Sequence, residues 1–335
     1  MSTNNKLFHN GNLSEKTFLV TGGAGFIGSN LVEYLIKNGA GKVRVLDNLS
    51  NGFHRNIEPY LKNDAFEFLE GDITDLSTCH EACSGVDLIS HQAALGSVPR
   101  SIEFPLNTHE ANATGFLNML VAARDAKIDR MVYASSSSVY GDLKDSPKKE
   151  SKIGKALSPY AVSKYTNELY ANVFALNYGL KIIGLRYFNV FGPRQDPNGP
   201  YAAAIPLFMD AVLNDKKAFI NGDGEQTRDF TYVENAVQAN VRALFAEHHK
   251  AYGKVYNVAV GENITVNQLF NEIKDIAGSE HMPDYRDERP GDIRNSLADI
   301  SLANELLNYE PQVKLKEGLS VTYDWFRKTF NLKNN

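Results

Sequence analysis

The fold of this chain is decided by the segment Phe18-Leu19-Val20-Thr21-Gly22-Gly23-Ala24-Gly25-Phe26-Ile27-Gly28. It joins a β-rich run at 17–21 to an amphipathic stretch with apolar residues four apart. Gly22, Gly25 and Gly28 lie at three-residue steps between the two. Glycine lets the chain turn sharply from a strand into a helix and lets the backbone approach a pyrophosphate. The segment therefore predicts a diphosphate site at a helix N-terminus.

On the C-terminal side of this turn, β-rich runs alternate with helical patterns through the first half of the chain. Strands are predicted at 17–21, 43–47, 66–69, 86–90, 131–135 and 181–186, and helices near 27–36, 117–126 and 165–175. Several of the strands are continuous apolar runs, which is typical of parallel strands buried on both faces. The fold class predicted is α/β, with a Rossmann-type doubly wound parallel sheet.

The texture of the sequence changes after Asn189, where glycine and proline become frequent. Short helices are predicted near 205–214, 233–247, 266–278 and 301–307. This pattern indicates a smaller C-terminal α/β lobe for substrate, partly interleaved with the sheet. The predicted organisation is an N-terminal extension (1–16), a dinucleotide-binding domain (17–189, with sheet contributions from around 230–260) and a substrate lobe (190–330).

Composition excludes several classes of function. The 335 residues carry a net charge of -5 and no basic run, so no affinity for nucleic acid is expected. No run of 18 apolar residues occurs, and residues 1–12 are polar, so neither a membrane span nor a secretory signal is expected. Cys79 and Cys83 are predicted to be reduced thiols of a cytoplasmic protein. The eight histidines include no H-x-x-x-H pair, so no metal site is expected.

An acidic residue selects the dinucleotide. Asp47 ends the second predicted strand, 19 residues after Gly28. A carboxylate there hydrogen-bonds the adenosine ribose hydroxyls and repels a 2′-phosphate. No arginine follows Asp47 directly, although Arg55 is near, so NAD is predicted rather than NADP. Asp72 closes the third strand and either contacts the adenine amino group or caps a helix.

A tyrosine and a lysine share one face of a predicted helix. Ser158 and Pro159 are typical of the N-cap and first position of a helix, which places Tyr160 and Lys164 one turn apart. A phenol has an ordinary pKa of about 10, and a nearby ammonium favours its ionised form. Tyr160 is therefore a candidate general base, although such a pair alone is usually a surface feature.

Four serines, 135–138, follow the predicted strand at 131–135. Because ligands bind outside the carboxyl ends of strands in open α/β sheets, these hydroxyls are expected to face the cofactor. One of them would hydrogen-bond a reacting alcohol beside Tyr160; a plain serine-rich turn is the alternative. The glycine turn, acid, serine cluster and Tyr/Lys pair in this order are more specific than any one of them.

From about residue 17 to 326, the sequence resembles the extended short-chain dehydrogenase/reductase family. Within that family it is most similar to nucleotide-sugar 4-epimerases, especially UDP-N-acetylglucosamine 4-epimerases of bacterial polysaccharide pathways. The resemblance is carried by the glycine turn, 91–99, 135–138, the Tyr160/Lys164 pair, 186–195, 226–230 and 289–292.

The resemblance implies roles for individual residues. The catalytic residues it implies are Ser136, Tyr160 and Lys164. The residues it implies for NAD are Gly22, Gly25, Phe26, Ile27, Gly28, Asp47, Asn48, Asp72, Ile73, Gln92, Ala93, Ala94, Tyr160, Lys164 and Tyr187. The residues it implies for substrate are Gly96, Ser97, Ser136, Ser137, Ser138, Tyr160, Asn189, Ala203, Arg228, Arg289, Asp292 and Ser296, with the two arginines neutralising the diphosphate.

Two departures distinguish this chain from relatives. Nucleotide-sugar 4,6-dehydratases have an Asp–Glu pair after the catalytic hydroxyl, and here Ser137 and Ser138 occupy those places, which argues against dehydration. Epimerases confined to UDP-glucose and UDP-galactose have a large tyrosine where this chain has Ser296. A small residue there would leave room for an N-acetyl group.

The reaction predicted is reversible C4 epimerisation of UDP-N-acetylglucosamine to UDP-N-acetylgalactosamine, through a 4-keto intermediate and tightly bound NAD. UDP-glucose and UDP-galactose are further candidate substrates. The alternatives are a UDP-glucuronate or N-acetylated uronate 4-epimerase, a net dehydrogenase, and a non-catalytic NAD sensor. The resemblance also implies a homodimer, paired through helices around 108–126 and 159–178.

Overall fold

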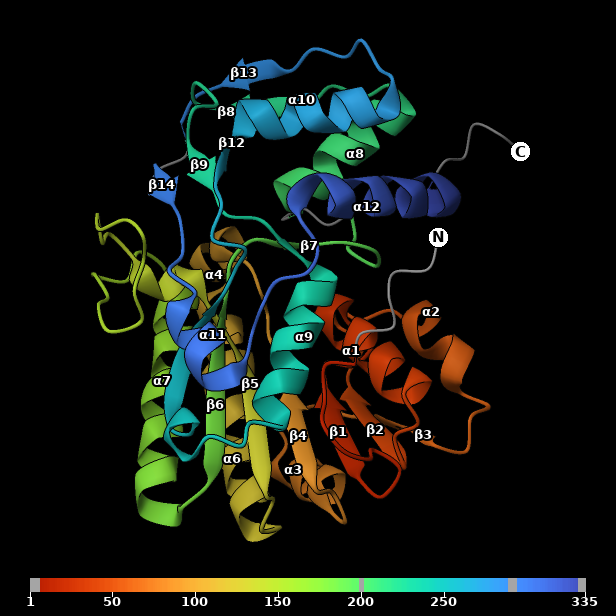
Figure 1. The fold of residues 1–335 in the computed structure, drawn as a ribbon, viewed down its shortest axis with the longest axis vertical. Helices are drawn as coiled ribbons and strands as arrows, with labels where there is room; N and C mark the ends of the chain where they lie inside the picture. The colour runs from red at the N-terminus through yellow and green to blue at the C-terminus, as the bar shows by residue number, and fades with distance from the viewer. Residues whose placement is uncertain (1–6, 199–201, 289–293, 331–335) are drawn as a thin grey trace.

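A central parallel sheet dominates the structure, a computed structural model that describes residues 7–198, 202–288 and 294–330 (Figure 1). Its strands are β1 (Thr17–Thr21), β2 (Lys42–Asp47), β3 (Phe66–Glu70), β4 (Leu88–His91), β5 (Arg130–Ser136), β6 (Lys181–Tyr187) and β11 (Lys254–Val258). Their order is β11-β6-β5-β4-β1-β2-β3, and every neighbouring pair is parallel. The chain winds outward in both directions from β1 and β4, which confirms the predicted Rossmann-type doubly wound fold.

Helices connect these strands and build the second lobe. The helical elements of the first half are α1 (Phe26–Lys37), α2 (His54–Ile57), the 3-10 turn η1 (Glu58–Tyr60), α3 (Leu76–Cys83), α4 (Val98–Glu103), α5 (Pro105–His109), the π-helical turn η2 (Glu110–Thr114), α6 (Gly115–Asp125), the 3-10 turn η3 (Ser137–Tyr140) and α7 (Pro159–Tyr178). The helical elements of the second half are α8 (Ala204–Asn214), α9 (Val233–Leu244), the 3-10 turn η4 (His249–Ala251), α10 (Val266–Ala277), α11 (Ser301–Leu307) and α12 (Leu315–Phe330). The short strands are β7 (Val190–Phe191), β8 (Phe219–Asn221), β9 (Thr227–Arg228), β10 (Thr231–Tyr232), β12 (Ile264–Thr265), β13 (Asp284–Arg286) and β14 (Asn295–Ser296).

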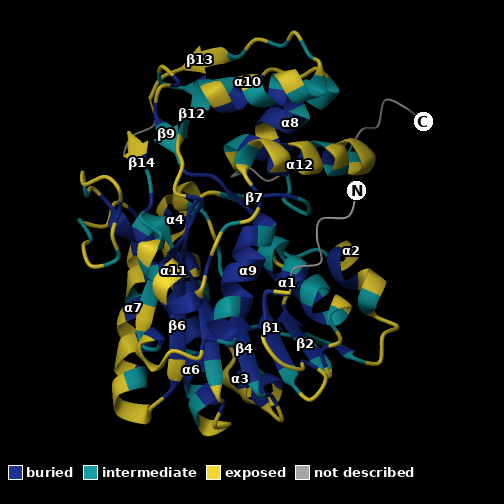
Figure 2. Cartoon of the chain, viewed as in Figure 1, coloured by how far each residue is buried: buried dark blue, intermediate teal, exposed yellow. Residues whose placement is uncertain are grey.

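Both faces of the central sheet are buried, as the dark strands of Figure 2 show. In β1, Phe18 and Val20 belong to the core that includes α1, α9 and α11, whereas Leu19 belongs to the core of α3, α6 and α7. Since successive side chains of a strand point to opposite faces, a strand covered on both sides needs apolar residues at consecutive positions. This explains why the predicted strands are continuous apolar runs.

Helices α8, α10 and α12 form a second lobe beyond the carboxyl end of the sheet, at the top of Figure 1. Phe208, Phe270 and Phe326 lie in its own apolar core. The chain also returns to the first lobe, because β11 pairs with β6 and α9 packs against the sheet. The two lobes are thus interleaved along the chain, whereas the limits 1–16, 17–189 and 190–330 remain predictions.

Most predicted elements are present, with differences at their ends. The four helices predicted in the second half correspond to α8, α9, α10 and α11, although α9 ends at Leu244. The strand predicted at 86–90 begins two residues later, because Gly85 (φ +70°) turns the chain just before it. Helix α12 was not predicted, although its buried Leu319 and Phe326 lie two turns apart on one face. No helix in the described part of the chain is long and apolar enough to cross a membrane.

Candidate active site

A cavity of about 490 Å³ lies at the carboxyl end of the parallel sheet. Five strands each contribute a lining residue at or just after their ends: Gly22 from β1, Asp47 from β2, Gln92 from β4, Ser136 from β5 and Tyr187 from β6. Open α/β sheets bind their ligands at this edge, and small-molecule sites range from about 300 to 1,000 Å³. This cavity is therefore the candidate active site.

The glycine-rich turn forms one wall of the cavity. Gly22 has φ +68°, and a Cβ added to it would lie 2.6 Å from the backbone N of Ala93. A Cβ on Gly28 would lie 2.2 Å from the carbonyl oxygen of Gly22, so neither position accepts a side chain without movement of the backbone. Gly25 precedes α1 and supplies no side-chain cap, which leaves backbone N–H groups of the first turn available to an anion. This wall fits the diphosphate of a dinucleotide.

The carboxylate of Asp47 is held at the end of β2. Its Oδ2 accepts a hydrogen bond from Ala24 N (2.9 Å) and its Oδ1 accepts one from Leu49 N (2.9 Å). Burial raises the pKa of Asp47, and the two N–H donors partly offset this effect. Arg55 lies over the ring of Phe53, 4.0 Å from its centroid, and is not part of the cavity lining. The arrangement fits the ribose hydroxyls of NAD.

Asp72 lines the cavity beside Asp47. Its Oδ2 accepts a hydrogen bond from Asn48 Nδ2 (2.7 Å), and its Oδ1 accepts one from Thr74 N (2.8 Å). The N-cap of the following helix, α3, is Asp75 rather than Asp72. Asp72 therefore caps a turn, not a helix, and it keeps its place in the predicted adenine pocket.

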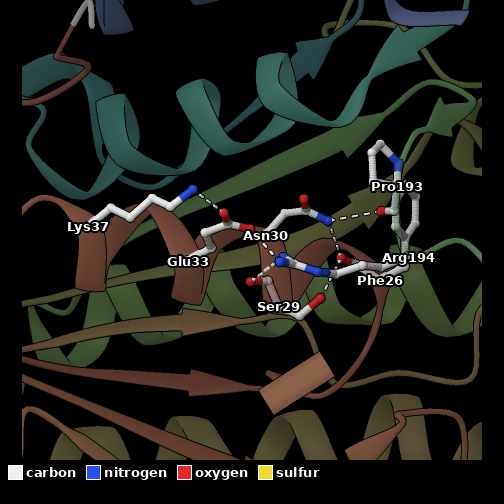
Figure 3. Close-up of polar contacts among 7 residues, drawn as sticks. All are labelled: Phe26, Ser29, Asn30, Glu33, Lys37, Pro193 and Arg194. Atoms are coloured by element: carbon white, nitrogen blue, oxygen red, sulfur yellow. Dashed lines mark hydrogen bonds and ion pairs between the residues drawn. The ribbon is translucent and has the colours of Figure 1, made fainter. Parts of the chain in front are cut away.

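Helix α1 is tied to the segment that follows β7, as Figure 3 shows. Arg194 donates from Nη1 to the carbonyl oxygen of Ser29 (2.9 Å) and pairs through Nη2 with the carboxylate of Glu33. Asn30 Nδ2 donates to the carbonyl oxygen of Pro193 (3.2 Å). These contacts fix the helix of the glycine turn against the first residues of the second lobe.

Helix α7 carries the tyrosine and the lysine. Ser158 accepts a hydrogen bond from Ala161 N (3.1 Å) and Pro159 is the first helical residue, which confirms the predicted helix start. Tyr160 and Lys164 both line the cavity, and Lys164 Nζ lies 6.0 Å from the centroid of the Tyr160 ring. The pair is therefore a feature of the cavity wall and not of the surface.

Both side chains reach the end of β5. The hydroxyl of Tyr160 hydrogen-bonds with that of Ser136, and Lys164 Nζ donates to the carbonyl oxygen of Ala134 (2.9 Å). Burial raises the pKa of Tyr160, and the bond with Ser136 partly offsets it. Burial lowers the pKa of Lys164 to about 8. Ionisation of Tyr160, which a nearby ammonium is predicted to favour, is thus opposed in this structure by burial.

A closed set of hydrogen bonds holds Tyr187 in the cavity wall. Its hydroxyl donates to Gln92 Oε1 (3.0 Å) and accepts from Asn240 Nδ2 (2.7 Å) of α9. Gln92 Nε2 in turn donates to Asn240 Oδ1 (2.9 Å). Burial raises the pKa of Tyr187, so this hydroxyl stays protonated and acts as a fixed hydrogen-bonding group.

The cavity gathers every residue predicted to bind NAD. They are Gly22, Gly25, Phe26, Ile27, Gly28, Asp47, Asn48, Asp72, Ile73, Gln92, Ala93, Ala94, Tyr160, Lys164 and Tyr187. Of the residues predicted to bind substrate, four also line it: Gly96, Ser136, Tyr160 and Asn189.

The other predicted substrate residues do not line this cavity. Ser97 caps α4, Ser137 and Ser138 begin η3, Ala203 precedes α8, and Arg228 and Ser296 are register partners in β9 and β14. Arg289 and Asp292 lie outside the described residues. Their roles in substrate binding stay predictions. Over the described ranges, no group of three His, Cys, Asp or Glu side chains could hold a metal ion.

Sequence analysis missed part of the lining. The missed residues are Leu46, Ser50, Asn51, Gly52, Gly71, Leu95, Ala111, Ala134 and Val190. Ser135, one of the four serines expected to face the cofactor, does line the cavity. Gly52 carried a usable signal, because a loop glycine after an acidic strand end suggests close packing; a Cβ on it would lie 2.8 Å from Asp47 Oδ1. Ala111 lies in the π-helical turn η2, and nothing in its sequence context marks it.

The fold and the cavity together define a dinucleotide-binding α/β enzyme. The sequence matches the family described as "NAD dependent epimerase/dehydratase family" over residues 18–259. A UDP-glucose 4-epimerase of Mycolicibacterium smegmatis is 38% identical over 311 residues, which span 92% of this chain and 98% of that relative.

Two solved structures share the whole architecture. A UDP-N-acetylglucosamine 4-epimerase from Methanobrevibacter ruminantium, in complex with UDP-N-acetylmuramic acid, is 42% identical, with a TM-score of 0.87 and coverage of 93% of this chain and 98% of that chain. A mutant UDP-glucuronic acid 4-epimerase from Bacillus cereus, with UDP-4-deoxy-4-fluoro-glucuronic acid and NAD bound, is 32% identical, with a TM-score of 0.87 and coverage of 94% and 100%. The chain belongs to the NAD-dependent epimerase/dehydratase family, and within it this protein is an NAD-dependent epimerase.

Proposed function

We propose that this enzyme interconverts UDP-N-acetylglucosamine and UDP-N-acetylgalactosamine by inverting the configuration at C4. The observation that carries the proposal is the meeting of Ser136, Tyr160 and Lys164 in the cavity that also gathers the predicted NAD-binding residues. The similarity to the UDP-N-acetylglucosamine 4-epimerase of Methanobrevibacter ruminantium supports the choice of sugar.

The three side chains divide the acid–base work. Tyr160 removes the proton from the sugar 4-hydroxyl and later returns it, while Ser136 hydrogen-bonds the same oxygen. Lys164 supplies the positive charge that favours the phenolate. Bound NAD⁺ supplies the chemistry of hydride acceptance from C4 and hydride return to the opposite face of the 4-keto sugar. The diphosphate anchors the sugar while it turns, and we assign Arg228 to that anchor.

Dehydration is not expected of this site. Elimination of water needs an acid beside the catalytic hydroxyl. At the two positions where nucleotide-sugar 4,6-dehydratases have Asp and Glu, this chain has Ser137 and Ser138. Both serines lie in η3, directly after Ser136. Their hydroxyls can hydrogen-bond sugar oxygens but cannot act as a carboxylic acid.

The sugar is decided by a substrate panel. UDP-N-acetylglucosamine, UDP-glucose and UDP-glucuronate are each incubated with the holoenzyme without added reductant, and the products are identified by NMR. We expect the N-acetylated sugar to give the highest kcat/KM. A preference for UDP-glucuronate would instead assign the activity named for the Bacillus cereus relative. In a parallel assay with free NAD⁺ added as oxidant, absorbance at 340 nm that rises in step with turnover would indicate a net dehydrogenase.

Ser296 is the proposed determinant of sugar size. It is buried in β14 and pairs in register with Arg228 of β9, so a larger side chain there would press on the substrate lobe. We expect Ser296→Tyr to lower kcat/KM for UDP-N-acetylglucosamine relative to UDP-glucose by at least about tenfold, equivalent to about 1.4 kcal/mol. Ser296→Ala is the matched control, with an unchanged ratio. An unchanged ratio in Ser296→Tyr would place the size limit elsewhere.

We propose that a second copy of the chain covers the outer face of α4, α5 and α7. The resemblance implied helices around 108–126 and 159–178, but no large apolar side chain is exposed within 108–126, whereas several are exposed within 102–106. Apolar side chains are exposed there: Ile102, Phe104, Leu106, Val162, Leu169, Val173 and Leu176. Figure 2 shows α7 as largely exposed along this side. A row of this kind on helices that pack together suits a four-helix interface with a symmetry-related copy.

Cys79 and Cys83 are free and buried, which supports a proposed site of action in the cytoplasm.

A further inference from the structure

A buried ion pair lies behind the catalytic helix, and the mechanism above does not use it. Glu168 of α7 and Arg186 of β6 have side chains only 7% and 3% exposed. Arg186 donates from Nη2 to Glu168 Oε2 (2.8 Å) and from Nε to Glu168 Oε1 (2.9 Å). Ser135 Oγ also donates to Oε1 (2.6 Å), so both carboxylate oxygens are engaged.

Glu168 lies on the same face of α7 as the catalytic pair. Tyr160, Lys164 and Glu168 follow one another at intervals of four residues, which stacks them along one side of a helix. Each of the three hydrogen-bonds one of the consecutive residues 134–136 of β5. These three hydrogen bonds therefore set the position of α7 along β5 and the rotation of α7 relative to that strand.

Arg186 is itself fixed within the first lobe. Its Nη1 donates to the carbonyl oxygen of Glu150 (3.2 Å), and its guanidinium lies 4.8 Å from the centroid of the Tyr140 ring. In β6, Arg186 is the register partner of Ser135 in β5. The guanidinium of Arg186 is thus held in place by the sheet and the segments next to it. Glu168 is the residue of α7 that binds this guanidinium.

Stability alone does not call for such a pair. Removing two charges from water is costly, and an apolar pair of similar volume often serves stability equally well. What an apolar pair lacks is direction, because a bidentate contact between guanidinium and carboxylate fixes both distance and orientation. Such fixing matters where the proposed catalytic groups lie four and eight residues away on the same helix.

We propose that Glu168 is a positioning residue that, through Arg186 and Ser135, holds α7 in the register at which Tyr160 meets Ser136 and Lys164 meets the end of β5. The inference rests on the proposed function, in which Tyr160 is the general base. It predicts that loss of the Glu168 carboxylate impairs proton transfer more than substrate binding.

Glu168→Gln tests this directly, because it keeps the length of the side chain and removes the charge. We expect kcat, calculated per mole of folded and NAD-loaded enzyme, to fall at least tenfold while KM changes less than twofold. We also expect the ascending limb of the kcat–pH profile to move to higher pH, because Tyr160 is no longer held against its partners. The matched control is Asp129→Asn, which breaks the exposed Asp129–Lys181 ion pair (2.9 Å) at the opposite end of β6. It is expected to leave both readouts unchanged.

A double variant separates positioning from stability. Glu168→Met combined with Arg186→Met replaces the pair by apolar side chains, and we expect it to recover thermal stability without recovering kcat or the pH profile. Recovery of both would overturn the proposal, as would a Glu168→Gln enzyme with the kcat and profile of wild type. Tyr160→Phe is measured in parallel: full activity of that variant would remove the assigned base, whereas its inactivity beside a normal Glu168→Gln would reject only the role of Glu168.

Discussion

At the scale of the residue, the site combines a phenol and an ammonium that burial drives toward their neutral forms. Burial raises the pKa of Tyr160 and lowers that of Lys164 to about 8. Lys164 is therefore mainly charged below pH 8, and Tyr160 ionises only where positive charge compensates for burial. In the proposed mechanism, the function of Tyr160 as a base therefore requires the positive charge of Lys164.

Lys164→Met is expected to expose this dependence. Removal of the ammonium raises the pKa of Tyr160 further, so the ascending limb of the kcat–pH profile moves to higher pH and kcat at pH 7 falls by roughly 10²–10⁴-fold. The profile is measured from initial rates with saturating UDP-sugar. Lys181→Met, at the exposed start of β6, serves as control. A Lys164→Met profile that overlays wild type would show that the ammonium does not support the phenolate.

At the scale of the element, α1 illustrates how a ligand-binding helix is held from its sides. Its N-terminus carries no side-chain cap, because the N-cap residue is Gly25, and the first residues of the helix line the cavity. The helix is anchored instead through its first two turns, where Arg194 contacts Ser29 and Glu33 (Figure 3). Arg194 has φ +75°, a left-handed conformation that an arginine seldom adopts without tertiary support. The tie thus offsets local strain and keeps the anion-binding end free.

Arg194→Ala is expected to lower the free energy of unfolding by about 1–2 kcal/mol, because one partly buried ion pair and one hydrogen bond are lost. Urea unfolding of the NAD-loaded enzyme measures the change. Lys37→Ala removes the other, exposed partner of Glu33 and is expected to have an effect below about 0.5 kcal/mol. Equal changes in the free energy of unfolding would show that the contacts of Arg194 stabilise the protein no more than the exposed Lys37–Glu33 pair does.

At the scale of the whole molecule, one carboxylate joins the two lobes. Asp229, between β9 and β10, accepts hydrogen bonds from Val260 N (3.0 Å), Gly261 N (3.0 Å) and Ala298 N (3.3 Å). These donors come from the end of the central sheet and from the segment after Ser296. Burial raises the pKa of Asp229 to about 6, although its three N–H donors act in the opposite direction.

This shift predicts how stability depends on pH. The folded protein binds the proton of Asp229 more tightly than the unfolded chain does, so its contribution to stability is present at low pH and is lost as pH rises from about 4 to about 6. Relative to Asp229→Asn, wild type is expected to lose on the order of 2 kcal/mol of unfolding free energy between pH 4.5 and pH 7. Urea unfolding at pH 4.5, 5.5 and 7 measures it. If the unfolding free energy of wild type instead rose with pH relative to that of Asp229→Asn, the raised pKa of Asp229 would be contradicted.

The proposed dimer is also tested at this scale. Leu106 and Leu176 are 82% and 77% exposed on α5 and α7, and burial of such side chains is worth about 1.5–3 kcal/mol each. Leu106→Glu combined with Leu176→Glu is expected to convert a dimer into a monomer in light scattering after gel filtration. Val321→Glu, on α12 away from this face, is the control. A wild-type protein that is monomeric at micromolar concentration would remove the proposal.

Sequence patterns sufficed wherever the physical cause was local. The turn from 17–21 into α1 needs its glycines for reasons of backbone geometry, and the spacing of Tyr160 and Lys164 fixes their common helical face. Buried parallel strands show as apolar runs for the same reason, since both neighbours of each residue face a core. The fold class followed from these signals, whereas most of the residues predicted to bind NAD followed from the resemblance to a known family.

Contacts between segments distant in the chain depended on the tertiary structure. Arg194 and Glu33 are 161 residues apart, and no period or motif pairs them. The junction at Asp229 and the attachment of Glu168 to Arg186 likewise exist only once sheet and helices are packed. A sequence determines directly what each short stretch can form, because backbone geometry and periodicity act locally. Which side chains then meet is decided by the packing of the whole chain, which orients polar groups by burying them together.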